Sequence, residues 1–333
     1  MPLYANEWIE LTTVPGLEEL LYLEAREKLG VTGGRVRRLG GRVYTPCRGC
    51  IGRVRRLTLA EHATILFSED SSLRKAVSDA MYLIRQYVEG LSTFSVHAER
   101  ITKELPATSV DIASEAGRII SEATGLNVSL DSPDIVFHVE YEAGTYRVGV
   151  RLTPHRGLRD RPYRLYVHPS ALNPILAAAM CRLAGASSIY DPYCGSGTIP
   201  IECALGGFWK AVGSDVVSRH IMGAKVNASL AGVREKTEFF VAEATRIGVT
   251  ATGVEAIVTN PPFGVREKAW GGLRKTYRSI FRVADDAGAG KVVVLTSKSL
   301  LLKRSAPENY VLEKKIHIIE GGLHAYIHVY RNY

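Results

Sequence analysis

Residues 187–198 read SSIYDPYCGSGT, and this stretch decides the fold of the C-terminal half. The apolar run 187–190 predicts a short buried strand, and the loop 191–198 carries two glycines separated by one residue. Glycine lets a backbone come close to a ligand, and Thr198 opens a helix whose N-terminal amides can hold an anion. In an open α/β sheet, ligands bind beyond the carboxyl end of such a strand. This loop is therefore the first candidate binding site.

From residue 171 onward, short apolar strands alternate with helical segments. The predicted strands are 187–190, 211–214, 237–241, 256–259 and 292–295. Strands that are buried on both faces and joined by helices indicate a parallel, doubly wound sheet. The chain then ends in two alternating runs joined by Gly321-Gly322, which predict an antiparallel hairpin on the edge of the sheet. We therefore expect an α/β, Rossmann-like domain over 171–333.

The first half of the chain has a different pattern. Residues 8–68 follow a β-α-β-β-α-β order, which is the ferredoxin-like arrangement. A second α+β unit follows, with a helix over 110–124 and a strand hairpin around Ala143-Gly144. The Arg/Pro-rich stretch after it has no consistent period and predicts a linker. The expected parts are a ferredoxin-like domain over 1–68, a second domain over 69–155, a linker over 156–170 and the Rossmann-like domain over 171–333.

Composition excludes several classes of protein. With 333 residues, 46% of them hydrophobic and 23% charged, the chain is too long for a single small module and too apolar for a disordered one. No apolar run approaches the roughly 20 residues that span a bilayer, and the N-terminus MPLYANEWIE does not resemble a secretory signal. We therefore expect a cytoplasmic protein without membrane contact.

The five cysteines, at positions 47, 50, 181, 194 and 203, are too few and scattered for a secreted disulfide scaffold. Cys47 and Cys50 form a C-x-x-C motif, but a zinc ribbon needs a second pair, so we expect no metal. Plain thiols are the favoured interpretation. A disulfide is the alternative, and it would suit a hyperthermophile. Gln86 is the only glutamine, and depletion of thermolabile amides points to a thermophilic source.

The net charge of +8 is unevenly distributed. Residues 26–56 carry ten lysines and arginines against one glutamate, and residues 151–164 and 264–282 are also basic. Residues 99–142 are acidic, with nine carboxylates against three cations. Any one basic stretch can be a solvated face, but three together favour a polyanionic partner such as nucleic acid.

Two acidic residues follow the next two predicted strands. Asp215 stands where a carboxylate can accept hydrogen bonds from both hydroxyls of a ribose, although it could instead cap the following helix. Glu243, after the third strand, is expected at the same edge of the sheet and could accept a hydrogen bond from an adenine amine. The third glycine of a dinucleotide fingerprint is replaced by Pro200, which argues against NAD.

The fourth strand ends in Asn260-Pro261-Pro262-Phe263. Two consecutive prolines make a rigid turn that lacks two amide donors. The Asn260 side-chain oxygen and the Pro261 carbonyl can accept two hydrogen bonds from an exocyclic amine, while Phe263 stacks on the base. These bonds would hold the lone pair of the amine nitrogen toward an electrophile, and at the end of the fourth strand, with a glycine loop at the first, the motif is a specific signal.

At these motifs the sequence resembles the THUMP-domain-containing RNA guanine-N2 methyltransferases. DPYCGSGT followed by IPIECA is similar to their S-adenosylmethionine loop, and TNPPFG is similar to their catalytic motif. PGLEELL, FSVHAER and LRDRPYRLYVHPSALNP resemble their N-terminal domain, their THUMP domain and the linker into the catalytic fold. Glu243 and Phe263 depart from the commoner Asp and Tyr.

The resemblance implies a role for each motif residue. The catalytic residues would be Asn260, Pro261, Pro262 and Phe263. The S-adenosyl-L-methionine-binding residues would be Asp191, Tyr193, Cys194, Gly195, Ser196, Gly197, Thr198, Asp215, Glu243, Ala244 and Asn260. From the charge distribution, we expect RNA contacts at Arg35, Arg37, Arg38, Arg100, Arg159, Arg161 and Arg266.

The expected activity is methylation of the N2 amine of a guanosine in tRNA, in the acceptor stem at position 6, by a monomer. S-G-T in the loop and Asn in N-P-P favour this subgroup over the position-10 tRNA enzymes, which remain an alternative together with rRNA. The same motif serves adenine amines in DNA and glutamine amides in proteins, but those enzymes have no use for an RNA-binding half. A non-catalytic RNA-binding protein that retains the fold is the alternative of another class.

Overall fold

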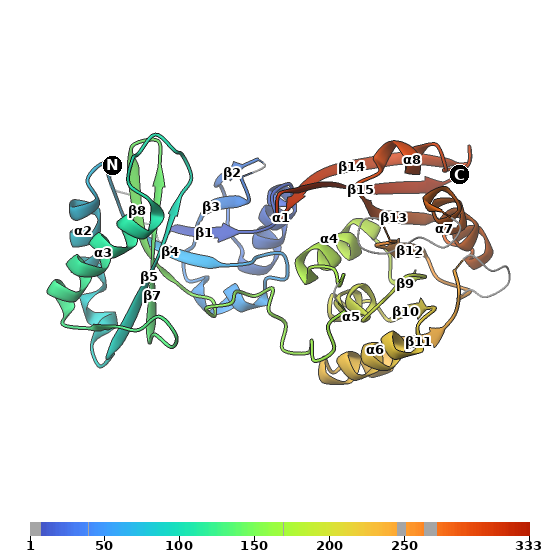
Figure 1. The fold of residues 1–333 in the computed structure, drawn as a ribbon, viewed down its shortest axis with the longest axis horizontal. Coiled ribbons are helices and arrows are strands. Elements are labelled where there is room, and N and C mark those ends of the chain that lie inside the picture. The colour runs from blue at the N-terminus through green and yellow to red at the C-terminus, as the bar shows by residue number, and fades with distance from the viewer. Residues whose placement is uncertain (1–7, 39, 169, 245–250, 263–271) are drawn as a thin grey trace. The chain divides into compact units, whose positions relative to one another are not determined.

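The computed structural model describes residues 8–38, 40–168, 170–244, 251–262 and 272–333. The chain divides into two compact units (Figure 1). The N-terminal unit comprises residues up to Thr13 with Leu21–Arg37 and Arg42–Leu158. The C-terminal unit comprises Val14–Leu20, Arg38–Gly41 and Arg159–Tyr333.

A single eight-stranded sheet, of order β2-β3-β1-β4-β8-β7-β5-β6, runs through the N-terminal unit. Its strands are β1 (Trp8–Thr12), β2 (Arg35–Arg37), β3 (Arg42–Pro46), β4 (Ala63–Asp70), β5 (Thr93–Arg100), β6 (Asn127–Val128), β7 (Ile135–Glu142) and β8 (Thr145–Arg151). The sequence suggests separate domains on either side of residue 68. In the structure residue 68 lies inside β4, which pairs with β8 and makes the sheet continuous.

Helices and turns of this unit follow local sequence signals. They are α1 (Glu18–Leu29), the 3-10 helix η2 (Ile51–Arg56), α2 (Leu73–Val88) and α3 (Ser109–Thr124). Thr108 and Asp111 form a reciprocal capping box at the start of α3, and Gly125 ends it with a φ of 74°. The second helix of the β-α-β-β-α-β order expected over residues 8–68 is only the short 3-10 helix η2.

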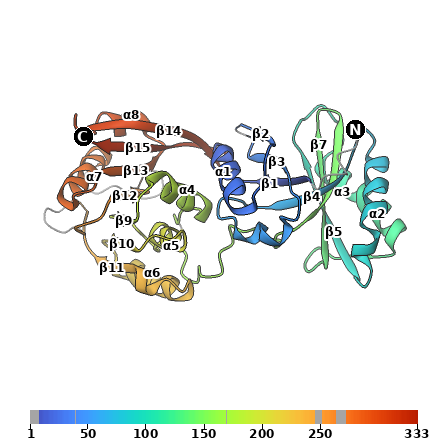
Figure 2. The same cartoon turned by 180° about the vertical axis from the view of Figure 1, so that it is seen from behind.

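The two longer helices, α2 and α3, lie side by side (Figures 1 and 2). Their apolar faces enclose a core with the sheet that includes Ile84, Phe94, Ile120 and Phe137. The strand hairpin β7–β8 turns at Ala143 and Gly144, as expected, with φ values of 47° and 83°. This pair of positive φ values matches a tight two-residue turn.

The C-terminal unit contains a seven-stranded sheet of order β11-β10-β9-β12-β13-β15-β14. Its strands are β9 (Ser188–Asp191), β10 (Lys210–Asp215), β11 (Thr237–Val241), β12 (Ala256–Thr259), β13 (Lys291–Thr296), β14 (Tyr310–Glu320) and β15 (Leu323–Asn332). Strands β9 to β13 are parallel, and β15 and β14 add an antiparallel edge. The prediction of a doubly wound α/β domain with a terminal edge hairpin is confirmed.

Helices cover this sheet on both sides (Figure 1). They are α4 (Pro174–Ala184), α5 (Thr198–Leu205), α6 (Ser218–Leu230), α7 (Leu273–Ala287) and α8 (Ser299–Lys303). Helices α4, α5 and α6 are neighbours, and α7 packs against α8. Tyr190, Tyr277 and Phe281 are fully buried between strands and helices. The 3-10 turn η3 (Arg234–Lys236) leads into β11.

The cysteines correct the expectation of plain thiols. Cys47 and Cys50 form a disulfide, and Cys181 of α4 forms a second one with Cys203 of α5. The Cα atoms of the two pairs are 5.3 and 5.2 Å apart, within the range that a disulfide bridges. The second pairing depends on the packing of α4 on α5, which the spacing of cysteines in the sequence does not reveal. Among the described residues, none of the helices is long and apolar enough to cross a membrane.

Candidate active site

The loop after β9 begins at Asp191, the last residue of that strand. The Asp191 carboxyl group is buried, and its Oδ1 accepts hydrogen bonds from the Thr259 hydroxyl at 2.7 Å and the Tyr193 amide at 3.1 Å. Because Thr259 ends β12, the Asp191–Thr259 bond ties together the carboxyl ends of two neighbouring strands. The loop of residues 191–198, which we call the cofactor loop, and the N-P-P motif therefore lie at the same edge of the sheet.

Two glycines in this loop adopt left-handed conformations, with φ values of 53° at Gly195 and 82° at Gly197. A Cβ atom at Gly197 would lie 2.9 Å from the Ala224 Cβ and 3.1 Å from the Phe239 ring, so close packing requires glycine here. A Cβ at Gly195 would meet nothing within 4 Å. Helix α5 begins at Thr198, as expected. The loop thus presents backbone and open space to a ligand.

Asp215 ends β10 beside this loop. Its Oδ2 accepts from the Gly195 amide at 3.1 Å, and its Oδ1 accepts from the Val217 amide at 2.9 Å and faces His220 Nδ1 at 3.1 Å. The carboxylate therefore shapes the loop and orders the start of α6, while its side chain keeps some exposure to solvent. It lies where a ribose would be bound next to the glycine loop.

The residues that follow β11 lie at the same edge of the sheet. The Ala242 amide donates to the Asp215 carbonyl at 3.1 Å, which brings the half-buried Glu243 and the buried Ala244 to the same edge. Burial raises the pKa of Tyr193, whose hydroxyl lies 3.0 Å from Ser279 Oγ. With Asn260 after β12, the predicted cofactor-binding residues thus come from four adjacent strand ends, those of β11, β10, β9 and β12.

Asn260 follows β12 directly. Its Oδ1 is buried and has no hydrogen-bond partner among the described residues. A buried carbonyl oxygen without a partner is costly, and it marks a position where a ligand can donate a hydrogen bond. Pro261 is buried and Pro262 is half-buried. Phe263, the predicted stacking residue, lies outside the described residues.

The burial of Asp191 predicts a specific pH dependence of stability. Burial raises its pKa to about 7, against the opposing hydrogen bonds from Thr259 and Tyr193. The folded state therefore holds a proton that the unfolded chain releases near its ordinary pKa of 3.8, and this stabilisation is lost as pH rises through 7. Asp191→Asn should gain stability relative to wild type as pH rises from 3.8 to about 7, by on the order of a few kcal/mol, with no further gain above that. Urea unfolding of both proteins at several pH values checks this, and parallel profiles would contradict it.

Two of the arginines expected to contact RNA have hydrogen-bond partners within the fold. Arg161 forms a two-pronged ion pair with the buried Glu202, with Nε–Oε1 at 2.9 Å and Nη2–Oε2 at 3.1 Å. Arg100 donates from Nη1 to the carbonyls of Leu105 and Ala107, both at 2.7 Å. Contact of either residue with RNA stays a prediction. Their guanidinium groups are used within the fold, which charge counting along the sequence cannot detect.

The other predicted RNA-binding arginines differ in their surroundings. The exposed ones are Arg35, Arg38 and Arg159. Arg37 is half-buried and pairs with Glu142 at 3.2 Å. Arg266 lies outside the described residues. Arg35 and Arg38 are therefore the best remaining candidates in the basic segment 26–56.

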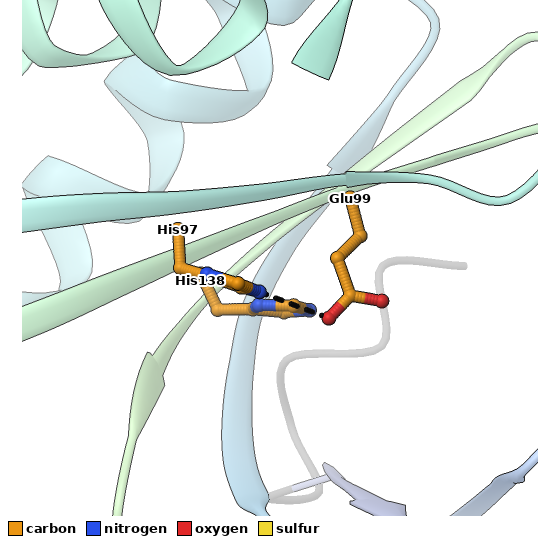
Figure 3. Close-up of side chains that lie close together, drawn as sticks. All are labelled: His97, Glu99 and His138. Carbon is orange, nitrogen blue, oxygen red and sulfur yellow. Dashed lines mark hydrogen bonds and ion pairs between the residues drawn. The ribbon is translucent and has the colours of Figure 1, made fainter. Parts of the chain in front are cut away.

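A cluster of ionisable side chains in the N-terminal unit was not predicted. His97 and Glu99 of β5 lie on one face with His138 of β7, as Figure 3 shows. His97 Nε2 is 3.0 Å from Glu99 Oε1, and the two imidazole rings stack with centroids 5.7 Å apart. These three side chains have the chemistry of metal ligands. Their i, i+2 and cross-strand placement could have been found only with the register of β5 and β7.

Arg42 lies within the same cluster. Its guanidinium contacts Glu99 and lies 3.0 Å from Glu10 Oε1 and 3.1 Å from Glu140 Oε2. Burial and the neighbouring Glu10 raise the pKa of Glu140 to about 7. A divalent cation bound to Glu99 would face this guanidinium at close range. We therefore describe the cluster as an ion network centred on Arg42.

The doubly wound sheet, with its glycine loop, carboxylate and N-P-P motif at three adjacent strand ends, defines a Rossmann-like methyltransferase. Residues 161–327 match the family described as "RMKL-like, methyltransferase domain", and residues 76–151 match the THUMP domain. The chain belongs to the family of THUMP-domain-containing RNA guanine-N2 methyltransferases.

Similar proteins cover nearly the whole chain. A relative from Thermus thermophilus named "tRNA (guanine(6)-N2)-methyltransferase" is 32% identical, over 97% of this chain and 98% of that protein. A relative of the same name from Archaeoglobus fulgidus is 30% identical, over 89% and 85%. The crystal structure of TrmN from Thermus thermophilus superimposes with a TM-score of 0.87 at 30% identity, covering 98% of this chain and all of that one.

Proposed function

We propose that this protein transfers a methyl group from S-adenosyl-L-methionine to the exocyclic N2 amine of a guanosine in tRNA, in the acceptor stem at position 6. The observation that carries the proposal is the buried, unpartnered Oδ1 of Asn260 at the end of β12, beside an open glycine loop. The tRNA substrate and its position are supported by the names of the two relatives that align over most of their length.

The residues present suit this cofactor. The open space at Gly195 gives room beside the loop, the Asp215 carboxylate lies next to it, and Glu243 lies at the same edge of the sheet. S-adenosylmethionine, when bound, supplies an electrophilic methyl group. The Asp191 carboxyl group links the carboxyl ends of β9 and β12 through its hydrogen bond with Thr259.

Asn260 and Pro261 would prepare the nucleophile. The guanine amine is a weak nucleophile because its lone pair is delocalised into the ring. Hydrogen bonds from its two N–H groups to Asn260 Oδ1 and the Pro261 carbonyl would localise that lone pair and aim it. The nitrogen would gain the methyl group as the bond between that carbon and the sulfonium sulfur breaks, leaving S-adenosylhomocysteine, and the nitrogen would lose one proton to solvent. Phe263 would stack on a base flipped out of the stem, at a cost of a few kcal/mol.

The proposed chemistry requires neither a residue from a second copy of the chain nor a metal, so we propose a monomeric enzyme without a catalytic metal. A tRNA substrate is consistent with a cytoplasmic location.

Asp215→Ala should weaken binding of S-adenosylmethionine by at least about tenfold. Charge-assisted hydrogen bonds to the ribose, of roughly 1.5–3 kcal/mol each, would be lost together with the hold on the Gly195 amide. Affinity for tRNA should change little. Isothermal titration calorimetry measures both quantities, and unchanged cofactor affinity would assign the carboxylate to ordering the start of α6 alone.

Arg35→Glu combined with Arg38→Glu should raise the Michaelis constant for tRNA and leave cofactor affinity unchanged. Both side chains are exposed in the basic segment, and phosphate contacts release counterions, so the defect should be largest at low salt and shrink as salt weakens wild-type binding more steeply. Steady-state kinetics at several salt concentrations measures it. Arg118→Glu, on the exposed face of α3 in the acidic stretch, is the matched control. Wild-type kinetics of the double variant at every salt concentration would remove this segment from the RNA-binding surface.

Incubation of the protein with methyl-labelled cofactor and tRNA, duplex DNA or a protein extract tests the class of substrate. We expect label in tRNA alone. Label in DNA or protein, or binding of tRNA with no transfer at all, would contradict the proposal and favour one of the alternatives.

A further inference from the structure

The segment that enters the methyltransferase unit is fixed at several points. We call residues 161–168 the strap. At its start, Arg161 and the buried Tyr163 both bond to Glu202 of α5, with the Tyr163 hydroxyl donating to Oε1 at 2.8 Å. Glu202 itself is almost completely buried. The strap is therefore held against α5 by a buried carboxylate with two partners.

Farther along, the strap meets α6 through the side-chain amide of Asn227. Oδ1 of Asn227 accepts from the Tyr166 amide at 3.0 Å, and Nδ2 donates to the Tyr166 carbonyl at 2.8 Å. The same Nδ2 donates to the carbonyl of Ser196 at 3.1 Å. Asn227 is 2% exposed. One buried amide thus bonds both the strap and the middle of the cofactor loop.

Helix α6 is shaped to receive the strap. A Cβ atom at Gly223 would lie 2.1 Å from Cδ1 of Tyr166, so the Tyr166 ring packs where only glycine leaves room. One turn earlier, the His220 ring lies with its centroid 4.4 Å from that of His168, and His220 Nδ1 faces Asp215. The strap therefore contacts neighbours of both the glycine loop and the proposed ribose carboxylate.

The cofactor loop has hydrogen bonds on either side of Ser196. The Cys194 amide donates to the Ser214 carbonyl at 2.9 Å, the Gly195 amide donates to Asp215, and the Gly197 amide donates to the Cys194 carbonyl at 2.8 Å, while the Gly197 carbonyl accepts from the Ile201 amide at 3.0 Å. Ser196 lies between two glycines in left-handed conformations. Its carbonyl is fixed by Asn227, so loss of that bond would release the part of the loop with the greatest conformational freedom.

We infer that Asn227 is a positioning residue that holds the cofactor loop in its binding conformation only while the strap is seated on α6. This inference rests on the proposed function, in which the 191–198 loop binds S-adenosylmethionine. Cofactor affinity would then depend on residues of the strap and of α6 that do not themselves line the loop.

Two variants test the inference from different sides. Asn227→Ala removes the bonds to the loop and the strap. Gly223→Ala displaces Tyr166 and leaves Asn227 and the loop unchanged in sequence. We expect each to weaken binding of S-adenosylmethionine roughly tenfold in calorimetry, the size of effect that loss of a buried hydrogen bond gives. We also expect a higher KM for cofactor, with kcat within about twofold at saturation.

Asn309→Ala is the control, because within the part of the chain that the structure describes its side-chain amide donates to Asn332 alone, at an exposed position. Hydrogen exchange of residues 194–197 gives a readout that does not require activity, and it should accelerate in both variants but not in the control. Wild-type cofactor affinity and loop exchange in both variants would overturn the inference. If wild type binds no cofactor, the proposed function fails. The exchange data then still decide whether Asn227 and the strap hold the loop.

Discussion

Asn260→Ala is expected to lower turnover by about 10² to 10³ in single-turnover assays, the cost of removing one transition-state hydrogen-bond acceptor or donor in comparable sites. Its Oδ1 is buried without a partner among the described residues, so alanine removes an unsatisfied group and should not destabilise the fold. Affinity for S-adenosylmethionine should change little, because the proposed contact is to the target amine.

Asn260→Asp is the informative companion, since it retains an acceptor oxygen at the same place. It should keep part of the activity that alanine loses. Turnover of Asn260→Ala equal to wild type, with enzyme saturated by both substrates, would remove the residue from the mechanism. A loss of thermal stability that parallels the loss of turnover would contradict a direct role of the Asn260 amide in methyl transfer.

Arg42→Met is expected to destabilise the N-terminal unit by about 3–5 kcal/mol, the usual cost of leaving buried charges without their partner. Arg42 lies against three carboxylates, and two of them, Glu10 and Glu140, are almost completely buried. Burial alone would raise the pKa of Glu10, but His138 and Arg42 hold it below its ordinary value. Without the guanidinium, Glu10 keeps His138 and Glu140 keeps Arg147 as partners, but the repulsion between the two carboxylates is no longer offset by a cation that they share.

Urea unfolding, monitored by hydrogen exchange of amides in the strands of the N-terminal unit, measures this loss of stability. Arg118→Met is the control, because Arg118 pairs with Glu115 and Glu122 on the solvent-exposed face of α3 and should contribute little. Equal effects of the two substitutions would show that Arg42 does not act as the centre of the ion network.

Much of the C-terminal unit could be predicted because its signals are local. Each apolar run that predicts a strand is a strand in the structure, with the same bounds for 237–241 and 256–259 and bounds within one residue for the other three. Glycines at positions 195, 197, 321 and 322 mark turns with positive φ, which short-range sequence patterns specify directly. Since parallel strands end at the same edge, the gathering of Asp191, Asp215 and Asn260 follows from the topology.

What could not be predicted depends on tertiary contacts. Pairing of β4 with β8 joins two parts of the N-terminal unit that the sequence suggests are separate domains. The disulfide between Cys181 and Cys203 depends on helix packing, and Arg100 and Arg161 have internal partners that no charge count reveals. The role of Asn227 could hardly be predicted, because in the sequence it is only one polar residue among the small residues of a predicted helix. Its role depends on the strap that folds onto it.

The central claim is tested most directly by mapping the product nucleotide. A tRNA transcript with guanosine at position 6 is incubated with the full-length protein and S-adenosylmethionine, digested, and analysed by mass spectrometry together with a transcript in which that guanosine is replaced. We predict N2-methylguanosine at position 6 of the first transcript and no methylated nucleoside in the second. A methyl group on an adenine, on another atom of guanine, or equally in both transcripts would contradict the proposed function.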